Sequence, residues 1–366
     1  MTFDEIKNEL KSKLGDSPEE NEKFLKKETE RFIREHNLEG IEAAGALILE
    51  NMPEAQREEV KRLTHVDGVR LDNLYKEIVQ LINEHKAVEA KPLAERLYKK
   101  ITVEYKEGEI AKFVSLRNPF EDNLYQLMFK PEKVLNRAPF DFAAMLTTYA
   151  YILVETGSPL DAMPVLQQAI EFNPVDCGPK FELAEVYKLL KNKQKLIEVT
   201  RDTLKIASSP ISIARCYANM GYILTDFQEY EDAAAFYTAS VMFAPNPAIP
   251  HEMRHLADLK GSPIIAPDRE RIINIMKKYD IEFGPNQDVI SVAAQLSANY
   301  LAEKDIPNAL QAMKLTYNLT LDERVKQLIL KYDPKAQQLV PSPENDGSAE
   351  TRMNITRTVN ENPEEE

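Results

Sequence analysis

Apolar residues recur at the spacing of α-helices along most of this chain, and the alternation that is typical of strands is rare. The clearest stripe, in residues 67–86, consists of Leu71, Leu74, Tyr75, Ile78, Leu81, Ile82 and His85. Shorter stripes predict five more helices, in residues 3–14, 18–36, 40–51, 53–63 and 92–101. We therefore expect residues 1–103 to form an N-terminal helical bundle, either a separate domain or eroded hairpins that extend the array described next.

Residues 104–138 are predicted to be a linker followed by a capping helix. Tyr105 to Arg117 is the one stretch without helical periodicity, and Glu107-Gly108 lies within it. This stretch is either a two-stranded hairpin or an irregular connection. Asn118-Pro119 then starts a helix whose apolar side would cap the array that follows.

Residues 139–248 contain three consecutive helix–turn–helix units. A small residue occupies the same internal place in each unit, at Ala150, Ala184 and Gly221, with separations of 34 and 37 residues. Helices joined by three or four residues lie antiparallel and close together, so a small side chain is needed where they cross. The pattern indicates stacked helical hairpins, because a period near 34 is typical of such arrays.

These units resemble tetratricopeptide repeats, most closely in the third unit, which carries Tyr217, Met220, Gly221, Leu224, Ala233, Tyr237 and Pro245. A fourth unit and a capping helix are expected in residues 286–333. The resemblance covers well under half of the chain. It implies an all-α fold, with a tetratricopeptide-type α–α superhelix after the N-terminal domain. The residues expected at helix crossings are Ala150, Ala162, Ala184, Gly221, Ala233, Ser297 and Ala309.

In tetratricopeptide arrays the first helix of each unit lines a concave, partner-binding surface. Carried over by alignment, that surface would include Thr147, Tyr151, Glu155, Glu185, Lys188, Arg215, Asn219, Tyr222 and Asp226. The family's best-known groove clamps a C-terminal carboxylate, but Thr147, Tyr151 and Glu182 stand where that groove has Lys and Asn. Only Arg215 fits, so we expect an extended peptide or a helix as partner rather than a chaperone tail.

An insertion in residues 249–285 contains the one tempting catalytic motif. His251-Glu252-Met253-Arg254-His255 matches the H-E-x-x-H pattern of zinc metalloproteases, in which two imidazoles share zinc and the glutamate acts as a base. Arg254 would oppose the metal charge, and no third histidine follows at the required spacing. We expect His251 and His255 to be ordinary surface or inter-helix residues.

Composition narrows the possibilities further. The net charge of −14 argues against general binding to nucleic acid or to anionic membranes. Residues 341–366 hold 2 basic and 7 acidic groups with few apolar ones, which predicts a disordered acidic tail. No signal peptide or membrane-spanning run is seen, so the chain is expected in the cytoplasm. Cys177 and Cys216 are expected to be small buried groups.

The leading hypothesis is a non-catalytic scaffold that binds a protein or peptide, with no cofactor. No phosphate loop, Cys-x-x-Cys pair or Gly-x-Ser-x-Gly motif is present. A second hypothesis is a regulator that responds to short peptides and acts through protein contacts, since helical modules followed by tetratricopeptide repeats resemble such bacterial regulators. The third is a zinc-dependent hydrolase that uses His251 and His255.

Overall fold

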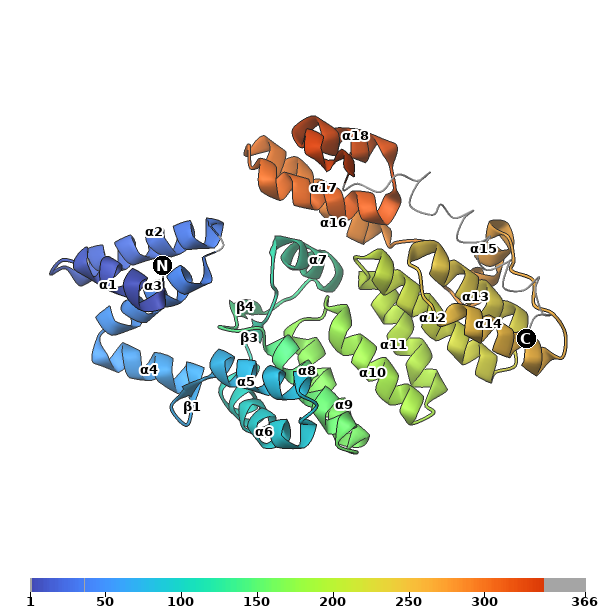
Figure 1. Cartoon of the computed structure of the whole chain (residues 1–366), viewed down its shortest axis with the longest axis horizontal. Coiled ribbons are helices and arrows are strands. Elements are labelled where there is room, and N and C mark those ends of the chain that lie inside the picture. Colours follow the sequence, from blue (N-terminus) through green and yellow to red (C-terminus); the bar gives the residue numbers. More distant parts are fainter. Residues whose placement is uncertain (1, 36, 339–366) are drawn as a thin grey trace. The chain divides into compact units, whose positions relative to one another are not determined.

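The protein is all-α. A computed structural model describes residues 2–35 and 37–338, and this part of the chain contains 18 α-helices with only two small strand pairs (Figure 1). None of the helices in these ranges is both long and apolar enough to cross a lipid bilayer. The expected acidic tail, residues 341–366, lies outside the described residues.

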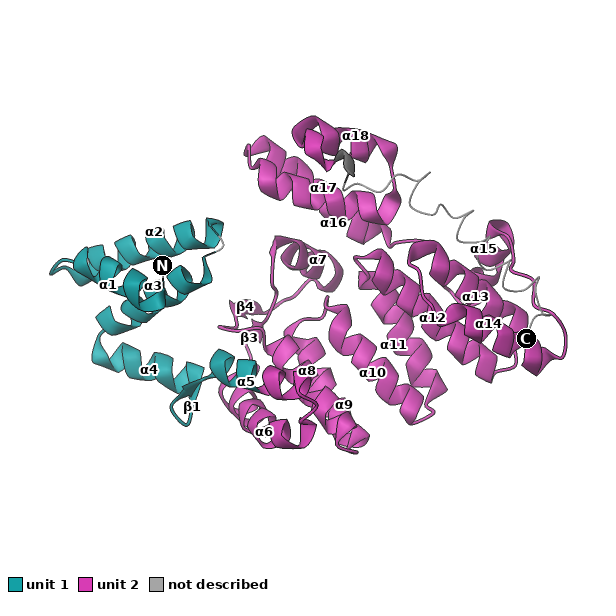
Figure 2. Ribbon diagram, in the orientation of Figure 1, with its two compact units in different colours: residues 1–77 teal, residues 78–366 magenta. Residues whose placement is uncertain are grey.

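The chain divides into two compact units, residues 1–77 and 78–366 (Figure 2). The sequence analysis ended the N-terminal bundle at residue 103, whereas the division falls after Glu77. Helix α5 (Leu71–Asn83) crosses this division, and α6 (Ala87–Glu104) packs against α8 in the second unit.

The first unit is built on three short amphipathic helices, α1 (Phe3–Ser12), α2 (Pro18–Arg34) and α3 (Leu38–Asn51). Each begins at a side chain that caps its first backbone amides: Thr2, Ser17 and Asn37. Their apolar sides share one core, which consists of Ile6, Leu10, Leu25, Phe32, Ala43, Ala44 and Leu47. Helix α4 (Glu54–Thr64) follows this core.

A tight hairpin precedes α5, where the sequence analysis expected helix from Asp67 onward. Strands β1 (His65–Val66) and β2 (Val69–Arg70) pair antiparallel around Asp67 and Gly68. Both turn residues have positive φ, 50° and 79°, as the two-residue turn between twisted strands requires. The helix therefore begins only at Leu71.

After the end of α5, the second unit continues with α6 and a strand pair that differs from both alternatives for residues 105–117, a two-stranded hairpin and an irregular connection. Pro92 lies inside α6 instead of starting it. Strand β3 (Ala111–Val114) pairs in parallel with β4 (Val134–Arg137), and α7 (Pro119–Phe129) forms the connection between them. Glu107-Gly108 is therefore not the turn of a hairpin, because parallel strands need a crossover.

Three antiparallel helix pairs follow: α8 (Phe142–Glu155) with α9 (Pro159–Phe172), α10 (Cys177–Leu189) with α11 (Lys193–Ile206), and α12 (Pro210–Asp226) with α13 (Tyr230–Phe243). The small residues expected at crossings are buried: Ala150, Ala162, Ala184, Gly221, Ala233, Ser297 and Ala309. At Gly221 the approach is close, since an added Cβ would lie 2.7 Å from the ring of Tyr237 on α13.

The insertion forms two helices, α14 (Ile249–Lys260) and α15 (Arg269–Lys277), which pack on α13. The segment after α15 returns to the third pair. The hydroxyl of Tyr217 donates to the Glu282 carbonyl at 3.0 Å and accepts from the Gly284 amide at 2.8 Å. The ring of Tyr217 also lies near Phe243 and Phe283.

The last pair, α16 (Gln287–Ala302) with α17 (Ile306–Thr320), is followed by α18 (Glu323–Tyr332) and a short 3-10 helix, η1 (Pro334–Gln338). Outside this group, the main contact of α16 within the described chain is α7, the helix that precedes the first pair. Segments from both ends of the second unit thus meet at α7 and α16.

The close crossing of α12 and α13 gives a stability prediction. Gly221→Ala should lower the free energy of unfolding by about 1 kcal/mol, because overpacking costs about 1–3 kcal/mol and the gain in helix propensity returns about 1 kcal/mol. Gly45→Ala is the matched control, since nothing lies within 4 Å of its added Cβ on α3. That variant should be stabilised. Denaturant unfolding of both variants measures the difference, and equal stabilisation would contradict the close approach.

Candidate functional site

One side of α8, α10 and α12 carries every residue that the sequence analysis assigned to partner binding. We call this side the first-helix face. It comprises Thr147, Tyr151 and Glu155 on α8, Glu182, Glu185 and Lys188 on α10, and Arg215, Asn219, Tyr222 and Asp226 on α12. Residues three or four apart share one side of a helix, so the members on each helix form a stripe.

Arg215 joins the stripes of α10 and α12. Its guanidinium lies 4.4 Å from the centre of the Phe181 ring, which orients it toward the carboxylates of α10. It is 3.3 Å from the Glu185 carboxylate and 3.9 Å from that of Glu182. Side-chain contacts thus hold the two first helices together at this point.

Lys188 forms a second link between the same helices. Its ammonium is 3.0 Å from Glu185 and lies over the ring of Tyr222 at 5.4 Å from the centroid. Tyr222 is still 40% exposed, so the other side of its ring is free for contact. At the C-terminal end of α12, Lys193 from α11 is 3.5 Å from Asp226.

The α8 residues contribute differently. Tyr151 is 40% exposed and Glu155 is exposed, but the Thr147 hydroxyl donates to the Ala143 carbonyl in its own helix at 2.7 Å. Helices α8 and α10 pack together. Across the described residues, no ion pair joins Glu155 to the network on α10 and α12. The structure therefore brings together Glu185, Lys188, Arg215 and Tyr222 directly, and Tyr151 and Glu155 only as neighbours on the same side.

Asn219 differs from its expected role as an exposed groove residue. It is only 3% exposed, and its Nδ2 atom has no hydrogen-bond partner among the described residues. Asn219 lies between Arg215 and Tyr222 on the stripe of α12. A buried amide donor without a partner carries a free-energy cost.

Burial changes the protonation behaviour of two groups on this face. It raises the pKa of Glu182, against the opposing attraction of Arg215. It also raises the pKa of Tyr222, with further contributions from Asp226, Glu185 and Glu252. Tyr222 is therefore a neutral ring at physiological pH, in a surrounding that repels added negative charge.

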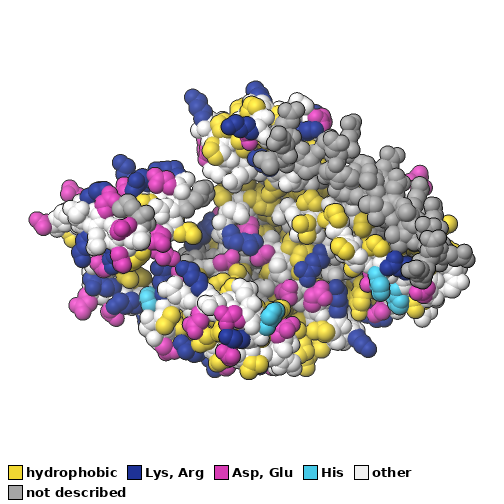
Figure 3. Space-filling model, viewed as in Figure 1, with side chains coloured by type: hydrophobic (Ala, Val, Ile, Leu, Met, Phe, Trp, Pro, Cys, Tyr) yellow, Lys and Arg dark blue, Asp and Glu magenta, His cyan; other side chains and the backbone are white. Residues whose placement is uncertain are grey.

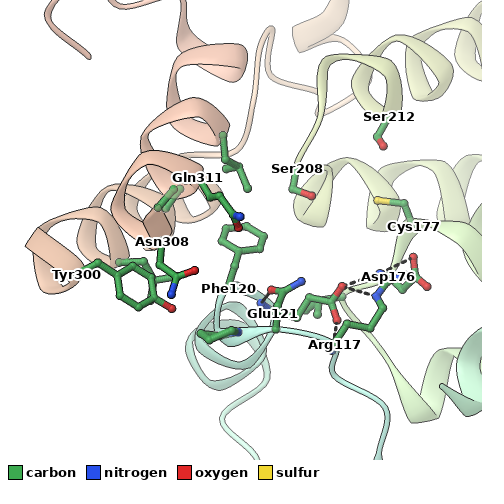
Figure 4. Close-up of a pocket in the computed structure, with 17 residues that line it drawn as sticks. Arg117, Phe120, Glu121, Asp176, Cys177, Ser208, Ser212, Tyr300, Asn308 and Gln311 are labelled. Carbon is green, nitrogen blue, oxygen red and sulfur yellow. Dashed lines mark hydrogen bonds and ion pairs between the residues drawn. The ribbon is translucent and has the colours of Figure 1, made fainter. Parts of the chain in front are cut away.

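A cavity of about 490 Å³ lies at the N-terminal ends of α10 and α12 (Figure 4). Its wall combines α7 and its preceding linker, the starts of these two helices, and the pair α16–α17. Figure 4 shows Tyr300, Asn308 and Gln311 on one side and Cys177, Ser208 and Ser212 on the other. Ser212 lies one helical turn before Arg215, so the cavity adjoins the end of the first-helix face.

A buried polar cluster fixes the α7 wall of this cavity. The Glu121 carboxylate accepts hydrogen bonds from the backbone amide and the Nε atom of Arg117, both at 2.7 Å. It also accepts from the Asn173 amide at 2.8 Å, which ties α7 to the end of α9. Arg117 further lies 3.2 Å from Asp176, the residue that caps α10. The start of α7 is thus held to the array by charge-assisted bonds.

The surroundings of the cavity contain more negative than positive charge. Arg117 faces Glu121 and Asp176. The charges of these three groups also act on the pKa of Asp141. Burial raises the pKa of Asp141, opposed by the Ala144 amide and by Arg117. Burial also raises the pKa of the Cys177 thiol to about 12, so this sulfur is protonated and poorly nucleophilic at neutral pH. The cavity is suited to binding polar groups rather than to thiol chemistry.

The histidine motif does not form a metal centre in the described chain. His251 and His255 are exposed on the first turns of α14, and Glu252 accepts a hydrogen bond from Tyr237 at 3.3 Å. Within residues 2–35 and 37–338, no group of three or more His, Cys, Asp or Glu side chains is placed to share a metal ion.

Sequence reasoning missed the cavity and the Glu121 cluster. Their residues come from segments 117–121, 175–177, 208–212 and 293–315, which only folding brings together. The one local signal is Asn118-Pro119, which marks the start of α7 and hence the position of Glu121 in its first turn.

The Glu121 cluster leads to a prediction on stability. Glu121→Gln should lower the free energy of unfolding by about 2 kcal/mol, because it leaves the Arg117 guanidinium without its buried partner. Asp122→Asn is the matched control, since its ion pair with Arg137 is more exposed and should contribute at most about 1 kcal/mol. Urea unfolding compares the variants, and equal losses would show that the burial of Glu121 is unimportant.

A second prediction concerns the pH dependence that Glu182 creates. Because burial raises its pKa in the folded state, the native protein binds this proton more readily than the unfolded chain does. Stability is therefore lost as the pH rises from the unfolded pKa through the higher folded pKa. Glu182→Gln should stabilise the protein at pH 7 relative to wild type, with no such gain at pH 3, where both states are protonated. Thermal unfolding at both pH values is the measurement, and destabilisation at pH 7 would show that the Arg215 ion pair dominates.

Comparisons with known proteins do not extend this description. A scan against family models gives no match to the chain, and a search of curated proteins gives no significant match. Functional inference therefore depends on the geometry of the first-helix face and the adjoining cavity.

Proposed function

We propose that this protein is a non-catalytic scaffold of the tetratricopeptide-repeat type, which acts in the cytoplasm and binds a segment of another protein on the first-helix face. The observation that carries the proposal is the arrangement of α10 and α12. Arg215 on α12 forms an ion pair with Glu185 on α10, and Lys188 on α10 lies over the ring of Tyr222, which remains 40% exposed. Tyr151 on α8 adds a second exposed ring to the same face.

This combination is suited to partner binding for two reasons. Exposed tyrosines offer large contact areas and lose little conformational entropy when they are buried, and Tyr and Arg are common anchors at interfaces. The ion pairs restrict the side chains before a partner arrives, which reduces the entropic cost of association. Adjoining polar groups of the cavity, such as Ser212 and Gln311, could then hold the end of a bound segment.

Charges of both signs over the visible surface agree with a specific protein contact. Figure 3 shows basic and acidic side chains intermixed, with apolar side chains between them. Such a surface lacks the extended basic patch that nucleic-acid binding requires, and the net charge of −14 opposes such binding as well.

The proposal is tested by affinity capture combined with crosslinking in the native cell. A variant with Tyr151→Ala, Arg215→Ala and Tyr222→Ala should bind the captured partner at least about tenfold more weakly, because each anchor removed from an interface costs about 1 kcal/mol or more. Leu160→Ala is the control, since Leu160 is 61% exposed on α9, away from the face. Capture unchanged in a correctly folded triple variant would reject this surface as the binding site.

A further inference from the structure

Carboxylates outnumber cations on and beside the first-helix face. Glu252 belongs with this group, because it accepts from the Tyr237 hydroxyl and contributes to the raised pKa of Tyr222, after burial and the nearer acids. Three cations, Lys188, Lys193 and Arg215, face five carboxylates: Glu155, Glu182, Glu185, Asp226 and Glu252.

All three cations are already engaged by these carboxylates. Lys188 and Arg215 share Glu185, at 3.0 and 3.3 Å, and Lys193 is paired with Asp226 at 3.5 Å. Within the described residues, Glu155 and Glu252 have no ion pair. An acidic partner would therefore have to displace existing pairs, whereas a basic partner finds carboxylates that are still available.

The exposed rings favour the same charge. Tyr151 and Tyr222 present aromatic faces, which attract ammonium and guanidinium groups. Lys188 already occupies such a position over Tyr222, which shows that the site accommodates a cation at a ring. The interaction gains strength where contact with a partner removes water from the ring.

We propose that the first-helix face binds an extended segment of a partner protein that is rich in Lys and Arg. This inference rests on the proposed function and specifies its ligand. The cationic side chains of the segment reach the free carboxylates and the two tyrosine rings.

The test uses the full-length protein, immobilised, and three pools of ten-residue peptides. Every second position is Lys or Arg in the first pool, Asp or Glu in the second, and Gln or Ser in the third, and the remaining positions are randomised. The protein should retain the basic pool at least about fivefold more than either other pool at low salt. Raising the ionic strength from about 0.05 to 0.3 M should reduce this retention, since screening weakens the attraction.

Two double variants, which each remove two negative charges, distinguish binding at this face from attraction by the overall negative charge of the chain. Glu155→Gln with Glu252→Gln should lose most of the retention of the basic pool. Glu171→Gln with Glu198→Gln, on the second helices α9 and α11, should retain it as wild type does.

The remaining outcomes are distinguishable. Loss of retention in both double variants equally, or no preference for the basic pool, would overturn the inference about charge. Retention of the acidic or neutral pools that depends on Tyr222 would overturn it as well, but would leave the proposed binding surface intact. The failure of the proposed function has a different signature, which is partner capture that survives loss of Tyr151, Arg215 and Tyr222.

Discussion

The close approach of paired helices is the constraint on which the rest of this structure depends. Gly221 on α12 faces the ring of Tyr237 on α13, with no room for a side chain between them. Ala150, Ala184 and Ser297 take the corresponding places in the other pairs, and all three are buried. Because each pair is this compact, the outward sides of α8, α10 and α12 lie near one another. Arg215 on α12 reaches Glu182 and Glu185 on α10 across these sides.

A second constraint acts at the start of the array. Glu121 is bound by Arg117 and Asn173, so α7 is fixed to the end of α9 by bonds that an exposed helix would lack. The same helix receives α16 from the far end of the unit. The cavity at the N-terminal ends of α10 and α12 exists because α7 and α16–α17 both border it. Its polar lining is therefore a consequence of tertiary packing rather than of any local motif.

The sequence predicted the features that depend on contacts between neighbouring residues. It did not predict those that depend on contacts between segments far apart in the chain. The all-α class was predictable, since helical periodicity is local. The hairpin at Asp67-Gly68 carries a clear turn signal, but a strong apolar stripe begins four residues later and concealed it. The pairing of β3 with β4 joins segments on either side of α7, and no local pattern records it. Asn219 lies on the expected stripe, yet its burial depends on neighbours that sequence spacing cannot identify. The cavity combines four distant segments, of which only the start of α7 at Asn118-Pro119 has a local signal.

The charge on the first-helix face shows why a list of ionisable residues is a poor guide to what such a surface binds. Arg215 and Lys188 would suggest an acidic partner if they were considered alone. Both are engaged by Glu185, and Arg215 is stacked on Phe181 as well, so their charge is largely compensated before a partner arrives. What a partner encounters is the remainder, which is negative at Glu155 and Glu252. A cation that approaches this remainder displaces no existing ion pair, and it gains the attraction of carboxylates that no cation of the protein already holds.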